Sequence, residues 1–466
     1  MTTPAAEVRF GRLERRGLLL GLTAAQLGLV GAALVTVVAA GVAGGPAGIA
    51  LSTPMWAAAL AWALVPVGGR PLVEVLPTAA AWATRRLTRT HRDLASPDAT
   101  TDGVADSASI AVPGLPGRVR VTMDDDGAAL LRCGRASASA VTIVAEVRGR
   151  GFLLESSPAQ DRRVAAWGRL LGSLCQLPDV VGAQVIHRAV PTAGGEVRQW
   201  WTGQIAASSP WARRIVDDLV EDTRTDTRLQ CLVGVALRPR RGHLDAAKTS
   251  LTESLDAAEL DLESWLTPHQ IVRLVRDAYD PAAPMVAGTP GGRIADSRPM
   301  GVVEEWSHAR SDSAFHATYW VSEWPRAATH PGFLRPLLFG SGVQRTFTLL
   351  ARPLPPGKSL REIRRARAEQ LADAATRARV GRVDEEVHRA AAAELTRREE
   401  DLVAGHGDLR FTGLLAVSAR SLDELAEACA STETAAAQAG CELRRLVGQQ
   451  VQAYAAASLP LARGLS

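Results

Sequence analysis

The chain has 466 residues and a formal net charge of +4, and 47% of its residues are hydrophobic. This length accommodates a membrane anchor and two or three soluble units. A mean hydropathy of +0.02 excludes a disordered chain and a transporter with many spans. The basic residues are almost all Arg and are interspersed with Asp and Glu. No direct nucleic-acid binding is therefore expected.

The N-terminal part predicts a membrane anchor. Residues 17–69 contain no charged side chain, a run too long for one span of about 20 residues and suited to two. Gly44-Gly45-Pro46 breaks the run, so the two spans are expected at about 17–43 and 47–67. Arginines flank the run on both sides, including the basic segment 1–16. The positive-inside rule then places both termini in the cytoplasm, in a multi-pass protein of the plasma membrane.

Two connecting segments follow the predicted anchor. Residues 70–93 are expected to form an interfacial helix, with Leu76 and Trp82 among the side chains that face lipid and with arginines at the headgroups. Residues 94–117 are small, polar and rich in Pro and Gly, which is typical of a linker.

The remaining sequence alternates between predicted strands and helices. A first α/β unit is expected at 118–299 and a second at 300–466, with a long charged helical insertion at 359–403. In the first unit, a hairpin turns at Asp124–Gly127, strands are expected at 141–147, 180–190 and 229–237, and helices at about 157–177, 210–222, 251–262 and 268–280. In the second unit, strands are expected at 314–323, 343–352, 409–419 and 441–447, and shorter helices at 330–339 and 422–439. This order is typical of split βαβ units, so the predicted fold class is α+β: a two-helix transmembrane hairpin followed by two ferredoxin-like cytoplasmic units.

The segment Gly357-Lys358-Ser359 lies between a predicted strand and a predicted helix, where a phosphate-binding loop would be. Arg352 stands where that motif needs its first glycine, and Pro355 and Pro356 have no N–H to offer a phosphate. We interpret the segment as a turn in which Ser359 is the N-cap of the helix and Glu362 completes a capping box.

Other chemistry-bearing residues are scattered. The five cysteines include no C-x-x-C pair, the nine histidines lack helical ligand spacing, and no G-x-S-x-G motif occurs. We therefore expect no catalytic residue, no metal and no cofactor. The charged stretch at 359–403 has two interpretations: a solvated helical hairpin, or a protruding element that docks a partner.

Several motifs, taken in order, resemble parts of conjugation machines. The two-span N-terminus with its Arg-rich exit is similar to the small PrgI-type membrane subunit of type IV secretion systems. The downstream region resembles the N-terminal, non-ATPase domain of TraC/VirB-type conjugation ATPases. The motifs that carry this second resemblance are Val164-Ala165-Ala166-Trp167-Gly168, Leu266-Thr267-Pro268, Tyr279-Asp280-Pro281, the long helix after Arg352-Pro353, and Gly448-Gln449-Gln450 with Ala453 and Leu459-Pro460. Over nearly the whole chain, the layout resembles an actinobacterial family of such fused proteins.

This resemblance implies a function. In the ATPases a motor domain follows, whereas this chain stops at Ser466, so the motor is expected to be a separate partner. The chain would then be a non-catalytic adaptor in contact with membrane lipid, the ATPase and other membrane subunits of a multi-subunit assembly. The residues expected to dock a partner are Arg364, Arg365, Arg367, Gln449, Gln450, Leu459 and Pro460.

Two alternatives remain open at this point. An EccE-like core component of a type VII secretion system also has a two-span anchor and a cytoplasmic α/β region. A membrane-bound enzyme of unknown class would need convergent titratable residues in a pocket, and the sequence points to none.

Overall fold

The computed structural model describes residues 22–464, apart from 68–69, 96–108, 135–139, 150, 153–154, 178, 192–200, 202–208, 223–226, 240–242, 282–297, 326–328, 340–343, 380–385 and 405–406. The predicted basic N-terminus therefore lies outside the described residues. So does Gly381, which lies within the predicted helical insertion at 359–403.

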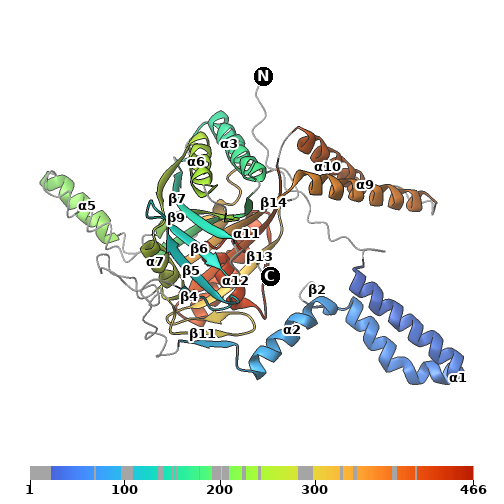
Figure 1. The fold of residues 1–466 in the computed structure, drawn as a ribbon. Coiled ribbons are helices and arrows are strands. Elements are labelled where there is room, and N and C mark those ends of the chain that lie inside the picture. The colour runs from blue at the N-terminus through green and yellow to red at the C-terminus, as the bar shows by residue number, and fades with distance from the viewer. Residues whose placement is uncertain are drawn as a thin grey trace.

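Helix α1 (Ala24–Leu64) is the apolar N-terminal element. Among the described residues it is the one helix long and apolar enough to cross a membrane. Gly45 interrupts it with a φ of 58°, a conformation that glycine adopts without a steric penalty. The chain turns back at this point. The reversal brings the two ends of α1 together, and Gln26 Nε2 near one end donates a hydrogen bond of 2.9 Å to the carbonyl of Ala63 near the other. Figure 1 shows the two halves of α1 side by side.

Helix α2 (Leu72–Leu87) connects α1 to the rest of the molecule. Two short strands, β1 (Pro66–Val67) and β2 (Arg70–Pro71), pair between the two helices. Figure 1 shows α2 running from the end of α1 to the lower edge of the body.

The body is built on one large antiparallel sheet, which confirms the predicted α+β class in its general form. The described strands follow the spatial order β3-β11-β12-β13-β15-β14-β8-β9-β7-β6-β5-β4, with β10 on β7 and β16 on β13. The bounds are β3 Arg92–Leu94, β4 Ser109–Ala111, β5 Arg118–Met123, β6 Ala129–Cys133, β7 Val141–Gly149, β8 Val180–Pro191, β9 Thr227–Leu237, β10 Leu260–Trp265, β11 Gly301–Glu304, β12 Ala309–Arg310, β13 Phe315–Glu323, β14 Gln344–Leu354, β15 Asp408–Ala419 and β16 Glu442–Arg445.

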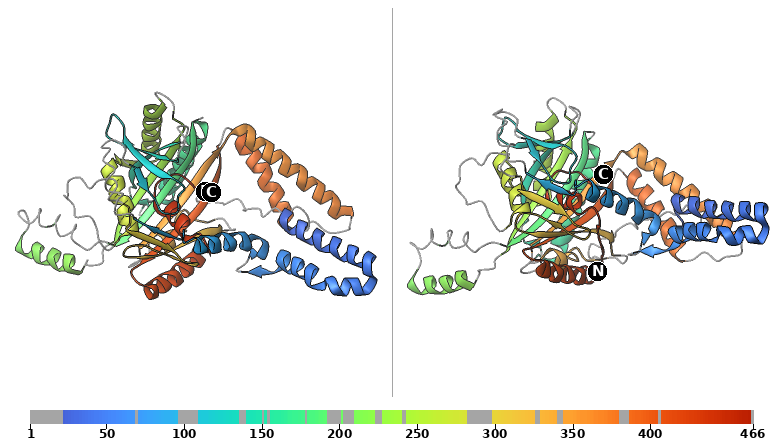
Figure 2. Two further views of the ribbon diagram at one scale, coloured as in Figure 1. Left: turned by 60° about the horizontal axis from the view of Figure 1, so that its bottom comes forward. Right: turned by 90° about the horizontal axis from the view of Figure 1, so that it is seen from below.

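The described helices of the body lie between these strands or project from them. Their bounds are α3 Ser157–Gln176, α5 Pro210–Asp222, α6 His243–Ala257, α7 Pro268–Tyr279, α8 Arg335–Leu338, α9 Pro356–Arg379, α10 Glu386–Val403, α11 Leu422–Gln438 and α12 Gln450–Ser458. In Figures 1 and 2, α5 stands away from the sheet on one side, while α9 and α10 project as a pair on the side of α1.

Two parts of the sheet share one connectivity. Unit one runs β7-α3-β8-β9-α6-β10, and unit two runs β13-α8-β14-β15-α11-β16. The strands lie side by side in the order β10-β7-β9-β8 in unit one and β16-β13-β15-β14 in unit two. Numbered along the chain within each unit, this order is 4-1-3-2 in both, and all neighbours are antiparallel. The second strands, β8 and β14, pair with each other and join the units into one sheet. Helix α5 is inserted after the second strand of unit one, and α9 with α10 after the second strand of unit two.

The core lies on both faces of the sheet. Helices α3 and α6 cover one face of unit one, and α8 and α11 cover unit two on that side. On the other face, α7, α12 and strands β4 to β6 enclose a third cluster of buried side chains. Helix α12 is buried all round because the sheet curves about it: Gln184 Nε2 on β8 donates to the carbonyls of Ala456 and Leu459 at 3.0 and 3.1 Å.

Several predicted element boundaries were wrong. The helix expected at 251–262 begins earlier, at His243, and ends before Glu259, whose φ of 56° reverses the chain into strand β10. Residues 109–117 of the predicted linker belong to the folded body, because Ile110 in β4 and Val112 are buried. The short helix expected at 330–339 is confined to α8.

Candidate functional site: the junction between α2 and the sheet

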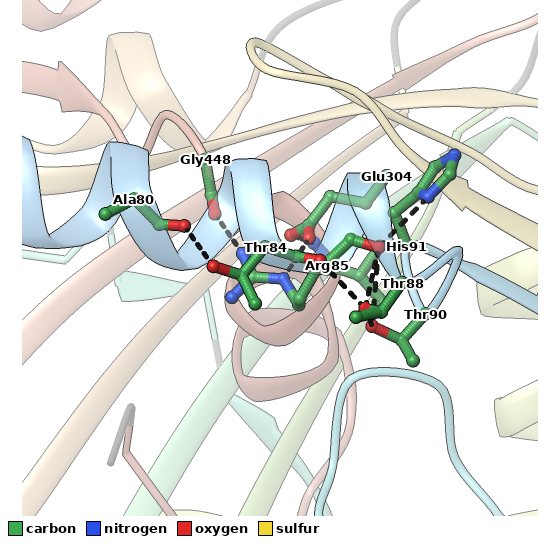
Figure 3. A network of polar contacts seen from close by, with 9 residues as sticks. Ala80, Thr84, Arg85, Thr88, Thr90, His91, Glu304 and Gly448 are labelled. Atoms are coloured by element: carbon green, nitrogen blue, oxygen red, sulfur yellow. Dashed lines mark hydrogen bonds and ion pairs between the residues drawn. The ribbon is translucent and has the colours of Figure 1, made fainter.

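The junction between α2 and the body joins the apolar N-terminal segment to the sheet. Arg85 and Arg86 lie in the last turn of α2, where positive charge is favoured by the helix dipole. Arg85 Nε lies 3.0 Å from Glu304 Oε2 at the end of β11, and its guanidinium also donates to the carbonyl of Gly448. Figure 3 shows Arg85 between these two partners. One side chain of α2 thus reaches both a strand of the sheet and the turn before α12.

Glu304 is the centre of the junction. It is 4% exposed, so its carboxylate depends on the charge and the hydrogen bonds supplied around it. Besides Arg85, it accepts a hydrogen bond of 3.3 Å from the backbone N–H of Val451 in the first turn of α12. A carboxylate at a helix N-terminus satisfies a backbone donor that has no partner within the helix. Glu304 therefore links α2 directly to the buried C-terminal helix.

Aromatic packing reinforces this link. Trp82 of α2 contacts Trp306 edge to face, with ring centroids 5.3 Å apart. The Arg86 guanidinium lies 5.1 Å from the Trp82 ring and pairs with Glu305 at 2.9 Å. Trp82, expected among the side chains that face lipid, is half-buried, and its ring packs against the body.

Gly448 fits this packing because it has no side chain. Its N–H donates to the carbonyl of Trp306 at 2.8 Å, and its φ is +70°. A Cβ at this position would lie 2.7 Å from the Trp306 ring. Only glycine therefore combines this backbone conformation with this close approach.

The structure separates the predicted docking residues into two groups. Arg364, Arg365 and Arg367 lie exposed on α9. Gln450 is 0% exposed and donates to the Leu446 carbonyl, while Leu459 and Pro460 are also buried. Gln449 immediately precedes α12 and is half-buried.

The buried C-terminal residues thus offer no docking surface in this fold. These residues were taken from the family resemblance, whereas a helix that is apolar on every side is typical of a buried element. On α9, Arg365 pairs with Glu369 at 2.9 Å and Arg367 with Glu399 of α10 at 2.8 Å. Such exposed pairs contribute little stability and can exchange partners readily.

The capping box expected at Ser359 was wrong. Helix α9 begins three residues earlier, at Pro356, and the backbone N–H of Ser359 donates to the Pro355 carbonyl at 3.1 Å. The Ser359 hydroxyl instead donates to Asp408 Oδ2 at 2.6 Å, and the same oxygen accepts from Arg398 of α10 at 2.6 Å. This segment therefore fixes the base of the α9–α10 pair to strand β15.

A second polar cluster lies inside unit two. His316 Nδ1 lies 2.7 Å from the Ser418 hydroxyl, and its Nε2 lies 2.7 Å from that of Ser311. Burial lowers the pKa of His316 to about 3, so the ring is neutral at physiological pH. The Ser311 hydroxyl donates to the Tyr279 carbonyl, and the His316 side chain is buried. This arrangement connects strands β13 and β15 with the end of α7.

Among the described residues, no group of three or more His, Cys, Asp or Glu side chains is placed to hold a metal ion. No protein-family model matches the chain, and no curated protein matches its sequence. The junction could not be predicted from the sequence, because its main partners, Arg85 and Glu304, are 219 residues apart in the chain.

Proposed function

We propose that this chain is a non-catalytic, membrane-anchored structural component of a type IV secretion or conjugation-like machine, which holds a separate ATPase motor at the inner face of the plasma membrane. The observation that carries the proposal is the junction. Through Arg85, Glu304 and the start of α12, the apolar N-terminal segment is attached to the buried C-terminal helix of the body and not only to its edge. An adaptor that holds a motor in place needs such a stiff connection.

In this proposal both halves of α1 cross the bilayer and both termini are cytoplasmic. The reversal at Gly45 and the contact between Gln26 and Ala63 support two antiparallel spans. We also interpret units one and two as ferredoxin-like, because their strand order and connectivity are those of split βαβ units. A reporter fused after Arg92 tests the topology, and labelling of the body from outside the cell would contradict it.

The docking surface for the motor is the exposed face of α9. Its arginines offer charge to acidic groups of a partner, and anchoring in the membrane raises the effective concentration of the docking surface. A stable interface should bury at least roughly 1,000 Å² in total. The buried residues around α12 hold the body together and take no direct part in docking.

The test is co-purification of the full-length protein, in detergent, with the ATPase encoded nearby. The variant Arg364→Glu/Arg365→Glu should lose most of the motor, because it reverses the charge on α9. Arg148→Glu, at an exposed arginine of β7, is the matched control and should retain it. If the wild-type protein never carries the ATPase, and the ATPase reaches the membrane equally well without it, the adaptor function is wrong. Co-purification with type VII core subunits instead would favour that system.

A further inference from the structure

Three large apolar side chains lie exposed around the edge of the body that adjoins α2. Leu87, the last residue of α2, is 85% exposed, Leu94 in β3 is 65% exposed and Met300 just before β11 is 74% exposed. Single exposed apolar residues are common on protein surfaces. Three at one edge indicate a surface that is covered in the working protein.

Leu94 and Met300 are neighbours although 205 residues separate them in sequence. Strand β3 pairs with β11 so that Leu94 lies opposite Gly301, and the N–H of Ala95 donates to the Met300 carbonyl at 2.8 Å. Strand β3 is at one end of the sheet order, so its outer edge has no further strand among the described residues. In Figure 1, β3 and β11 lie beside α2, at the end of the body remote from α3 and α6.

The charge at this edge is positive. Arg89 and Arg92 are exposed, and neither forms an ion pair with a described residue. The carboxylates nearby are already engaged. Asp93 pairs with Arg298, Glu305 pairs with Arg86, and Asp312 accepts hydrogen bonds of 2.8 Å from the backbone N–H groups of Met300 and Gly301.

We propose that this edge of the sheet rests on the anionic surface of the bilayer that holds α1. Leu87, Leu94 and Met300 enter the interfacial region, and Arg89 and Arg92 contact lipid phosphates. The occupant follows from the continuity of the edge with α2 and α1 and from the charge. The outer backbone groups of β3 stay at headgroup level, where water and lipid headgroups satisfy them. The inference rests on the membrane anchoring in the proposed function but not on the motor.

The test places a fluorophore at this edge in the full-length protein. Leu94→Cys and Met300→Cys are labelled with an environment-sensitive dye, and the wild-type chain labelled in the same way gives the background from its native cysteines. The matched control is Met123→Cys, equally exposed at the end of β5 in the hairpin at the other end of the sheet. The labelled proteins are reconstituted into phosphatidylcholine vesicles with about a third phosphatidylglycerol and a nitroxide-labelled lipid.

The expected result is strong quenching of the dye at residues 94 and 300 and little at residue 123. Arg89→Glu/Arg92→Glu, combined with the label at residue 94, should lower the equilibrium constant for contact with lipid, by about fivefold for each lost positive charge. The same loss is expected when phosphatidylglycerol is omitted.

Resistance to alkaline extraction distinguishes the failures. If the protein resists extraction, so that α1 is inserted, and the dyes at 94 and 300 are still quenched no more than the dye at 123, the edge does not contact lipid and the inference is overturned. Dyes that become shielded only when another subunit is added overturn it as well. Loss of the protein on extraction contradicts the anchor itself, whereas failure to bind a motor leaves this result unchanged.

Discussion

Units one and two share a connectivity but differ in what they hold. Beside unit one, Lys248 of α6 pairs with Asp124 and Asp126, and this contact closes the β5–β6 hairpin over the body. Beside unit two, the buried Glu304 pairs with Arg85 and so holds helix α2, which leads to the apolar helix α1. The same arrangement, an ion pair between distant segments, completes the core in one place and couples the body to α2 and α1 in the other.

The largest effect should come from Glu304→Ala. Removing the carboxylate leaves Arg85 without its charge partner and the Val451 N–H without an acceptor. We expect the free energy of unfolding to fall by about 3–5 kcal/mol. Urea unfolding of the full-length protein in detergent, followed by tryptophan fluorescence, measures it. Glu305→Ala is the adjacent control, and its exposed ion pair should be worth about 0.5 kcal/mol. Equal effects of the two variants would mean that the junction is not coupled to the core.

Gly448→Ala should cost about 2–3 kcal/mol, because the new methyl group meets the Trp306 ring and the positive φ is strained. Gly127 in the β5–β6 turn provides the comparison beside unit one. Its φ is +87° but nothing lies near the position of a Cβ, so Gly127→Ala should cost only about 1 kcal/mol. Thermal unfolding of both variants separates the clash from the backbone strain. If Gly127→Ala is the more damaging, the close packing at Trp306 is wrong.

Lys248→Met tests the counterpart contact beside unit one. The lysine stem is retained but Asp124 loses its buried counter-charge, and we expect a loss of about 2 kcal/mol. The attachment of α2 should be unaffected, since Lys248 lies in α6. Limited proteolysis between α2 and β4 measures this attachment, and cleavage should accelerate in Glu304→Ala but not in Lys248→Met. Equal acceleration would show that the two contacts are not independent.

The last effect, which is absent at neutral pH and grows as the pH falls, belongs to unit two. Burial holds the pKa of His316 at about 3, whereas an unfolded histidine takes up a proton below about 6.5. The unfolded chain therefore binds one proton more between these values. Stability should fall as pH is lowered through this window, by up to about 1.4 kcal/mol per pH unit from this group. The variant His316→Gln should show a shallower pH dependence over the window. An unchanged slope would place the titration elsewhere.

The sequence predicted elements with a one-sided apolar pattern well and missed those without one. Helices α3, α5 and α7 begin and end close to the expected residues, because capping signals such as Thr267-Pro268 are local. Helix α12 was missed as an element because its alanines are buried on every side and show no periodicity. Strand β10 was partly taken for helix, since the reversal falls on Glu259, a residue type that rarely adopts a positive φ.

The functional part of the molecule was harder to predict. The exposure of Arg364, Arg365 and Arg367 could be predicted from sequence, because the charged face of a helix is visible in its residue spacing, and their role in docking stays a prediction. The ion pair between Arg85 and Glu304 depends on the sheet, which brings β11 beside α2. No sequence pattern near either residue predicts it. The burial of Gln450 and Leu459 likewise depends on the curvature of the whole sheet.

The pairing of β8 with β14 determines the positions of the two helical insertions. The two strands are antiparallel, and each is followed by the insertion of its own unit, α5 or the α9–α10 pair. The insertions therefore leave the sheet at opposite ends, as Figure 2 shows. Because both insertions lie outside the β8–β14 pairing, we expect that either insertion can change in length without disturbing this pairing. The α9–α10 pair projects on the side of α1 and α5 on the opposite side, so the two insertions present surfaces that are far apart on one chain.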